Sequence, residues 1–259
     1  MEQQTKQEII DTFGFGNKRE RFFLMDGHKF SKPFADGTNQ AMREIIADYQ
    51  VYVDKDRLWE PETTKIVKES VKEGDICVDV GASVGYFTLL FSRQVGKTGK
   101  VYSFEPTDNQ FVYLNKNVEL NGYQDRVKTY NLAAWDKDED NLVRRDAEKI
   151  SENPARIQVN AGYNKPIRGI VLDDILPEKV DFIKIDVDGS EPKVLKGLIK
   201  TIERNPQLKL VVEYYPECIK KLGNDPKGIT DVLDKYFDCE VIKGDYGPEY
   251  WNYFCTRKC

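Results

Sequence analysis

Apolar runs of strand length alternate along the chain with segments whose apolar residues recur at helical spacing. The run Ile76–Val80 suits a strand buried on both faces, and the apolar positions that follow it, from Val84 to Val95, have helical spacing. The period changes at Gly81 and Gly85. This change predicts a strand–turn–helix unit with a ligand site at the carboxyl end of the strand.

The rest of the chain continues this alternation. We expect further strands at 100–104, 127–132, 180–185, 208–212, 239–243 and 250–256, and helices at 61–72, 108–120, 194–202 and 229–236. Strands that alternate with helices favour an α/β fold built on a mostly parallel sheet. The last two strands follow each other without a helix between them, so they predict an antiparallel hairpin at the edge of the sheet.

Three segments differ in composition and divide the chain. Residues 1–70 mix polar, helix-like stretches with a short aromatic alternation at Tyr49–Val53, and we interpret them as an N-terminal cap or extension. Residues 71–259 contain the strand–turn–helix unit and form the main domain. Within it, residues 136–169 are charged and rich in turn residues, which predicts an insertion on the substrate side. Loops on a rigid scaffold commonly carry substrate contacts, and a solvated charged loop is the equal alternative.

Composition narrows the class of protein. The formal net charge of −5 weighs against a nucleic-acid partner and favours a small or uncharged substrate. No apolar run approaches the ~18 residues that a membrane span requires. The first eight residues lack the basic and apolar regions of a secretory signal. We therefore expect no membrane span and a cytoplasmic location.

The cysteines and the histidine form no local metal-site motif, and a zinc site made of Cys255, Cys259 and His28 would require a long-range coincidence. The five cysteines are odd in number and form no Cys-x-x-Cys pair, so we expect reduced thiols. The single histidine, His28, lies beside Gly27 and far from any motif, which favours a residue of a surface loop over a catalytic one.

The spacing of the glycine turn narrows the ligand. Gly81 and Gly85 are separated by Ala82, Ser83 and Val84, whereas a dinucleotide fingerprint requires Gly-x-Gly-x-x-Gly. Glycines allow the backbone to approach a ligand closely, and a new helix offers unpaired N–H groups. The next strand ends in an acidic residue, Glu105, whose carboxylate can accept both hydroxyls of a ribose. This combination resembles the S-adenosylmethionine site of Rossmann-like methyltransferases, and a generic buried strand–helix unit is the alternative.

Two later stretches are expected at the same edge of the sheet. The small residues at Asn131–Ala134 are able to lie against a planar adenine, and plain packing is an equal alternative. The strand at 180–185 places Asp186 at its carboxyl end, facing the same cavity as Gly81. Lys184 lies inside this apolar strand, where a charge is costly unless it is paired. We expect a carboxylate partner for it, and a purely structural ion pair is the alternative.

Residues 73–256 resemble the FkbM family of S-adenosylmethionine-dependent methyltransferases. The resemblance rests on the stretch Val78–Gly85 (Val-Asp-Val-Gly-Ala-Ser-Val-Gly), on Phe104-Glu105-Pro106 and on Ile183–Glu191 (Ile-Lys-Ile-Asp-Val-Asp-Gly-Ser-Glu). Where the family usually has Glu before the glycine of the third motif, this chain has Asp188, which is one methylene shorter.

The resemblance implies a fold, a cofactor and a reaction. The fold is the Rossmann-like class I methyltransferase fold, with a mostly parallel seven-stranded sheet, a C-terminal antiparallel hairpin and a helical and strand extension at the N-terminus. The reaction is methyl transfer from S-adenosylmethionine to a hydroxyl of a small molecule or glycan, with a sugar favoured. Asp186, Glu191 and Lys184 are the catalytic candidates, because the motifs lack histidine. The residues implied for the cofactor are Asp79, Gly81, Ala82, Ser83, Gly85, Glu105, Ala133, Ala134 and Asp186.

A metal and other activities are the remaining alternatives. O-methyltransferases of the catechol and macrolide-sugar kind hold Mg²⁺ at strand ends that here finish in Asp186 and Glu213. Because Tyr214 and Tyr215 stand where further acidic or amide ligands are usual, we favour a site without metal. The other activities are a non-catalytic cofactor-binding protein, a methyltransferase for a nitrogen or a macromolecule, and a nicotinamide oxidoreductase. Aromatic candidates for the acceptor pocket are Tyr163, Tyr214, Tyr215 and Trp251.

Overall fold

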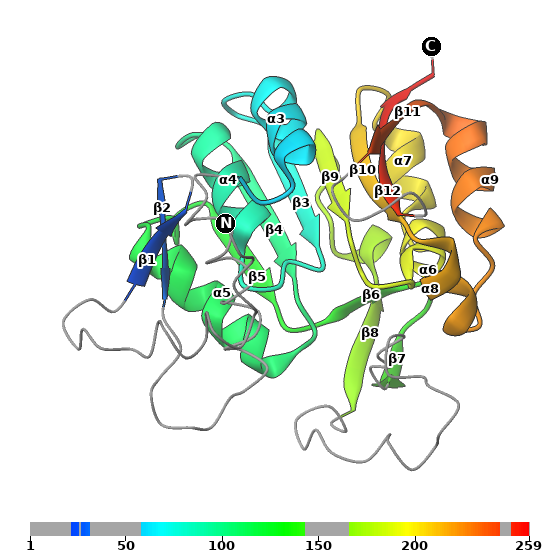
Figure 1. The fold of residues 1–259 in the computed structure, drawn as a ribbon, viewed down its shortest axis with the longest axis horizontal. Coiled ribbons are helices and arrows are strands. Elements are labelled where there is room, and N and C mark those ends of the chain that lie inside the picture. The colour runs from blue at the N-terminus through cyan, green and yellow to red at the C-terminus, as the bar shows by residue number, and fades with distance from the viewer. Residues whose placement is uncertain (1–21, 26, 32–57, 143–165, 244–249, 259) are drawn as a thin grey trace, which may run out of the picture.

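Seven strands form the central sheet in the computed structural model, which describes residues 22–25, 27–31, 58–142, 166–243 and 250–258 (Figure 1). In sheet order the strands are β11 (Phe237–Lys243), β12 (Trp251–Arg257), β10 (Lys209–Tyr214), β9 (Phe182–Ile185), β3 (Ile76–Val80), β4 (Lys100–Phe104) and β5 (Val127–Tyr130). Only β12 runs antiparallel to its neighbours, so the predicted mostly parallel sheet with a C-terminal hairpin is confirmed.

Helices cover both faces of this sheet, because its strands are apolar on both sides. On one face α3 (Pro61–Ser70), α4 (Tyr86–Gln94) and α5 (Asp108–Leu120) pack over a core that includes Cys77 and Phe182. On the other face α6 (Glu191–Lys196), α7 (Ile199–Arg204), α8 (Pro216–Lys221) and α9 (Lys227–Tyr236) pack over Val78 and Ile183. The alternation of strand residues between the two cores is the two-residue period of a strand.

The helix predicted at 194–202 is interrupted in the structure. It is divided into α6 and α7, and Gly197 is the residue that ends α6. A Cβ atom on Gly197 would lie 2.1 Å from the carbonyl oxygen of Trp135. The backbone at Gly197 therefore lies closer to the backbone at Trp135 than a residue with a side chain permits. The helix is interrupted at this contact.

A second, three-stranded sheet lies at the carboxyl end of β5 (Figure 1). It contains β6 (Ala133–Trp135), β8 (Ile167–Val171) and β7 (Glu139–Leu142); β6 is parallel to β8, and β7 is antiparallel to it. The predicted strand at 127–132 is thus shorter, and the predicted insertion at 136–169 contains β7 and the beginning of β8. Residues 143–165 lie outside the described part of the chain. The short turn η3 (Leu172–Asp174) leads from β8 back to the core.

The N-terminal residues that are described form a hairpin and a helix. The strands β1 (Phe22–Met25) and β2 (His28–Ser31) pair with each other, and β2 packs against α5. His28 is only 2% exposed and meets the ring of Tyr123 edge-on, so the prediction of a surface-loop histidine is wrong. The predicted helix that begins at Pro61 is confirmed as α3, and the predicted strand at Tyr49–Val53 lies outside the described residues.

One pair of cysteines also differs from the prediction. Cys239 of β11 and Cys255 of β12 stand directly opposite each other and form a disulfide, so the expectation of reduced thiols is wrong for this pair. Cys77 and Cys218 are free and buried, and Cys259 lies outside the described residues. A count of cysteines does not detect a cross-strand pair, because the pair depends on strand register. In the described part of the chain, no helix has the length and apolar character that crossing a membrane requires.

Candidate active site

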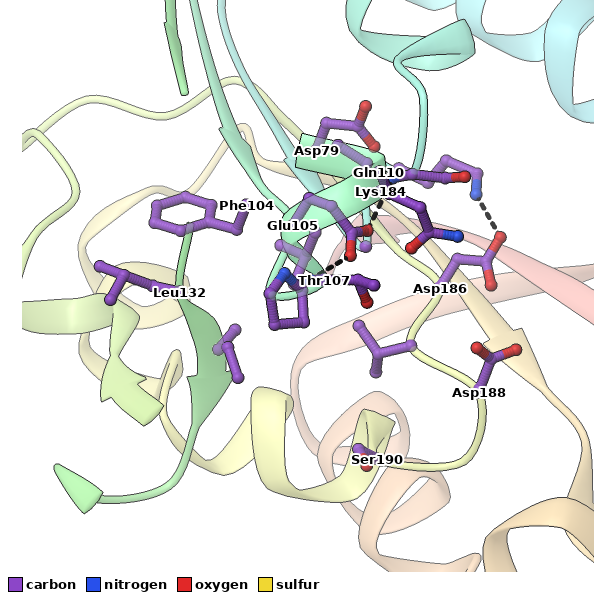
Figure 2. A pocket seen from close by; sticks show the side chains of 18 of the residues that line it. Asp79, Phe104, Glu105, Thr107, Gln110, Leu132, Lys184, Asp186, Asp188 and Ser190 are labelled. Atoms are coloured by element: carbon purple, nitrogen blue, oxygen red, sulfur yellow. Dashed lines mark hydrogen bonds and ion pairs between the residues drawn. The ribbon is translucent and has the colours of Figure 1, made fainter. Parts of the chain in front are cut away.

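A cavity of about 640 Å³ opens where the carboxyl ends of β3, β4 and β9 meet the small sheet (Figure 2). The predicted site residues on its wall are Asp79, Gly81, Ala82, Ser83, Glu105, Ala133, Ala134, Lys184 and Asp186. Three other candidates, Gly85, Glu191 and Glu213, are not on the wall. Its aromatic lining comes from Trp59, Tyr86, Phe87, Phe104 and Trp135. Tyr214, Tyr215 and Trp251, predicted as walls, do not line it, and Tyr163 lies outside the described residues.

The glycine turn after β3 is closed by backbone contacts. Gly81 and Gly85 have φ values of 85° and 97°, which glycine adopts without penalty. A Cβ on Gly81 would lie 1.8 Å from the carbonyl oxygen of Asp186, and one on Gly85 would lie 2.8 Å from Leu114 Cδ1. The N–H groups of Gly81 and Ala82 both donate to the carbonyl of Phe104. The glycines therefore permit close packing of the turn on β9 and α5, and Gly81 also lines the cavity.

Glu105 is held rigidly at the end of β4. It is 4% exposed, and its carboxylate accepts hydrogen bonds from the N–H of Ser83 (2.9 Å) and the N–H of Thr107 (2.7 Å). The side chain of Asn131 donates to the carbonyls of Glu105 and Pro106, which fixes the backbone from the neighbouring strand end. Each carboxylate oxygen has a second lone pair, so Glu105 can still accept hydroxyl donors.

An apolar wall lies beside Glu105. It consists of Phe104, Leu132, Ala133 and Ala134, and the ring of Phe104 stacks on Tyr130 with centroids 4.7 Å apart. In the view of Figure 2, Phe104 and Leu132 lie on the far side of Glu105 from the pair formed by Lys184 and Asp186. The cavity thus has one end suited to a flat apolar ring and another end that is charged.

Lys184 and Asp186 form the ion pair at the charged end. Lys184 Nζ donates to Asp186 Oδ2 at 2.7 Å, and the same ammonium lies 3.8 Å from Glu60 Oε1. Burial alone would lower the pKa of Lys184, but the charges of Asp186 and Glu60 outweigh it and hold that pKa above the ordinary lysine value. The Lys184 side chain is 4% exposed and that of Asp186 is 28% exposed, so Asp186 is the partner that a ligand can reach. The predicted carboxylate partner of Lys184 is confirmed.

Asp79 lies next to Lys184, on the neighbouring strand β3. Its Oδ2 accepts a hydrogen bond of 2.6 Å from the hydroxyl of Thr88, and Asp79 and Lys184 are paired residues in adjacent strands. Burial raises the pKa of Asp79 to about 6, although Lys184 and Thr88 both act in the opposite direction. The cavity wall therefore includes a carboxyl group whose pKa is raised by burial.

Glu191 is fully buried behind the loop that follows β9. Its Oε1 accepts hydrogen bonds from the N–H groups of Val187 (2.9 Å) and Gly189 (3.2 Å), and it does not line the cavity. Burial raises the pKa of Glu191 to about 7. The same loop contains Asp188 with φ of 53°, a conformation that Asp tolerates better than most residues. The geometry therefore gives Glu191 a role in shaping the loop that carries Asp186 and Asp188.

Glu213 likewise does not line the cavity. The hydroxyl of Tyr250 donates to Glu213 Oε1 at 2.6 Å. Burial, together with the charges of Asp186 and Glu191, raises the pKa of Glu213 well above its ordinary value. Among the described residues, no group of three or more His, Cys, Asp or Glu side chains is arranged to hold a metal ion.

Glu60 also lines the cavity, although no sequence pattern indicated it as a site residue. This residue precedes α3, is 8% exposed and lines the cavity next to Trp59. Its side chain accepts a hydrogen bond of 3.1 Å from Asn252 of β12. No local pattern marks Glu60, because its partners come from β9 and β12.

The chain has relatives of known class. Residues 79–237 match the family model described as the methyltransferase FkbM domain. The chain is 25% identical over 214 residues to methyltransferase sdnD of Sordaria araneosa, with 70% of this chain and 80% of that protein covered. It is 24% identical over 228 residues to the hexuronic acid methyltransferase AglP of Haloferax volcanii, with 84% and 86% covered.

Solved structures share the fold. Methyltransferase FkbM from Methylobacillus flagellatus aligns with a TM-score of 0.52 and 14% identity, covering 96% of this chain and 58% of that one. An rRNA methylase from Streptococcus thermophilus aligns with a TM-score of 0.50 and 11% identity, covering 76% and 95%. At these identities the likeness concerns the fold alone, which is that of the class I methyltransferases.

Proposed function

Because the chain belongs to the FkbM methyltransferase family, we propose that it transfers a methyl group from S-adenosylmethionine to a hydroxyl of a small molecule or glycan, with a sugar as the favoured acceptor. One observation carries this proposal: a single cavity joins Glu105 and its apolar wall to the pair formed by Lys184 and Asp186. The relative AglP, a hexuronic acid methyltransferase that 84% of this chain matches, supports a sugar.

The residues at the apolar end fit the cofactor. Glu105 keeps acceptor capacity for the two ribose hydroxyls, and Phe104, Leu132 and Ala133 offer a flat apolar surface for adenine. Asp79, Ser83 and Asp186 continue the wall toward the charged end, where carboxylates suit the positive charges of the cofactor. When bound, S-adenosylmethionine supplies an electrophilic methyl group.

Asp186 is the residue that we assign to proton transfer. It is the more exposed member of its ion pair, and the hydrogen bond from Lys184 fixes the direction of its carboxylate. In that place it can align an acceptor hydroxyl and take its proton while the oxygen is methylated, and alignment supplies most of the rate enhancement. Glu191 was the other candidate for this role, but its carboxylate faces the loop backbone.

The test has a binding arm and a turnover arm. Calorimetry with S-adenosylhomocysteine measures cofactor binding without an acceptor, and labelled S-adenosylmethionine measures methyl transfer to glucose, galactose and mannose, each as a methyl glycoside and as a uronic acid. We expect wild-type binding and transfer, and transfer reduced about 100-fold or more in Asp186→Asn. The matched control Asp174→Asn, on an exposed residue of η3, should behave as wild type. Absence of S-adenosylhomocysteine binding would refute the whole proposal, and binding without transfer would favour a non-catalytic cofactor-binding protein.

We propose further that the reaction needs no Mg²⁺. Asp186 already has an ammonium partner, which weakens its attraction for a second cation, and Glu213 does not line the cavity and accepts a hydrogen bond from Tyr250 at Oε1. Exhaustive EDTA treatment should therefore leave the rate unchanged. A loss that Mg²⁺ restores would show that the metal takes part.

A further inference from the structure

Glu60 lies at the charged end of the cavity, close to Lys184. It stands outside the matched region 79–237, at the N-cap of α3, with φ of 39°. This left-handed conformation is uncommon for a residue with a side chain. Contacts elsewhere in the structure must therefore stabilise this backbone conformation of Glu60.

These contacts come from two strands of the central sheet. Asn252 of β12 donates both to Glu60 Oε2 at 3.1 Å and to the hydroxyl of Thr63 at 3.0 Å. Oε1, the other carboxylate oxygen, lies 3.8 Å from Lys184 Nζ of β9. One oxygen thus fixes Glu60 to the C-terminal hairpin, and the other approaches the lysine that holds Asp186.

The ammonium of Lys184 is confined from several sides. Asp186 accepts its hydrogen bond at 2.7 Å, Glu60 lies at 3.8 Å, and the ring of Phe87 lies 4.4 Å below it. Burial raises the pKa of Glu60, and the charge of Lys184 counteracts part of that increase. Asp186 alone already neutralises the charge of Lys184, and Glu60 adds a second buried carboxylate. Charge balance alone therefore does not explain why Glu60 is there.

We propose that Glu60 is a positioning residue for methyl transfer, which acts through Lys184 by holding its ammonium in the one place from which it orients the Asp186 carboxylate. This inference rests on the proposed function. Glu60 need not touch the acceptor for it, because a misplacement of the reacting groups by about 1 Å can cost about 100-fold in rate.

The test compares Glu60→Gln with a matched control on the same helix. Glu62→Gln removes the same charge from an exposed position of the first turn of α3 and should leave turnover unchanged. We expect Glu60→Gln to lower kcat by about 10- to 100-fold. The Kd for S-adenosylhomocysteine should change by less than kcat does, because Glu105 and the apolar end of the cavity are unchanged. Asn252→Ala, which leaves the Glu60 charge but removes its anchor, should lower kcat in the same direction.

The decisive measurement repeats Glu60→Gln in a Lys184→Met background, with the acceptor panel and assay used above. If Glu60 acts through Lys184, it should cause no further loss of kcat in that background. An equal loss in both backgrounds, or no loss in the wild-type background, would overturn the inference and leave the proposed function intact. A wild-type protein that does not bind S-adenosylhomocysteine would instead overturn the proposed function, and the inference with it. Thermal unfolding of each variant separates these results from a failure to fold.

Discussion

Replacing Gly81 with Ala tests the explanation of the glycine turn most directly. The added Cβ would lie 1.8 Å from the carbonyl oxygen of Asp186, whereas ordinary contacts begin at 3.4 Å. The turn after β3 must therefore move away from the end of β9. Both the turn and this strand end line the cavity. A ligand-contact role for Gly81 predicts weakened binding in a protein that remains stable, while a packing role predicts lost stability.

The expected cost has two parts. A residue with a side chain at φ of 85° costs about 1–2 kcal/mol. Forcing two packed backbones apart costs about a further 1–3 kcal/mol. We therefore expect Gly81→Ala to lower the free energy of unfolding by about 2–5 kcal/mol, a large share of the 5–15 kcal/mol that is usual for a folded domain.

Gly122→Ala is the matched control. Gly122 also has a positive φ, 69°, but a Cβ there would meet nothing within 4 Å. Gly122→Ala includes the cost of a positive φ and the change in the entropy of the unfolded chain. It does not include the steric clash with another part of the backbone. Urea unfolding followed by tryptophan fluorescence and circular dichroism gives both free energies. If Gly81→Ala is no more destabilising than Gly122→Ala, the packing explanation is refuted.

Three further predictions address other parts of the molecule. Burial raises the pKa of Glu191 to about 7, above its value in the unfolded chain, so this group's stabilisation is complete below about pH 4.3 and is lost as the pH rises through 7. Glu191→Gln should reduce the wild-type fall in unfolding free energy between about pH 4 and 8 by about 3 kcal/mol, and an unchanged urea-unfolding profile would contradict this. Glu105→Gln should raise the Kd for S-adenosylhomocysteine about 10- to 100-fold in calorimetry, because a charged acceptor becomes neutral; an unaltered Kd would remove Glu105 from the cofactor site. Replacing both Cys239 and Cys255 with Ser should lower the free energy of unfolding by about 3 kcal/mol, since the disulfide spans 16 residues. An intact mass of the wild type that shows no disulfide would contradict this prediction.

Much of the fold followed from local pattern. The change of period at Gly81 and the apolar runs of β3, β4, β9 and β10 marked the buried strands, because strands covered on both faces contain few polar residues. The small sheet was missed, since β6 has only three residues and β7 is largely polar. Residues such as Glu139 and Asp140 give β7 no apolar run to recognise.

The site was predicted where motif and strand end coincide. Glu105, Lys184 and Asp186 each stand at or near the end of an apolar strand, and topology then brings those ends together. Glu191 shares a motif with Asp186 but turns back to cap its own loop, a direction that spacing alone does not reveal. Glu60 could not be predicted as a site residue, because its partner Asn252 is 192 residues away in the sequence.

The pairing of Leu142 with Ile167 across β7 and β8 has a consequence for the wall of the cavity. The chain departs from the small sheet and rejoins it at opposed positions, both of which line the cavity. For a segment anchored in this way, each doubling of length adds only about 0.6 kcal/mol of closure entropy. By this measure, a change in the number of residues between Leu142 and Ile167 has only a small entropic effect on the stability of the small sheet. The register of β7 and β8, and not the length of the segment that connects them, therefore determines where Leu142 and Ile167 meet the cavity.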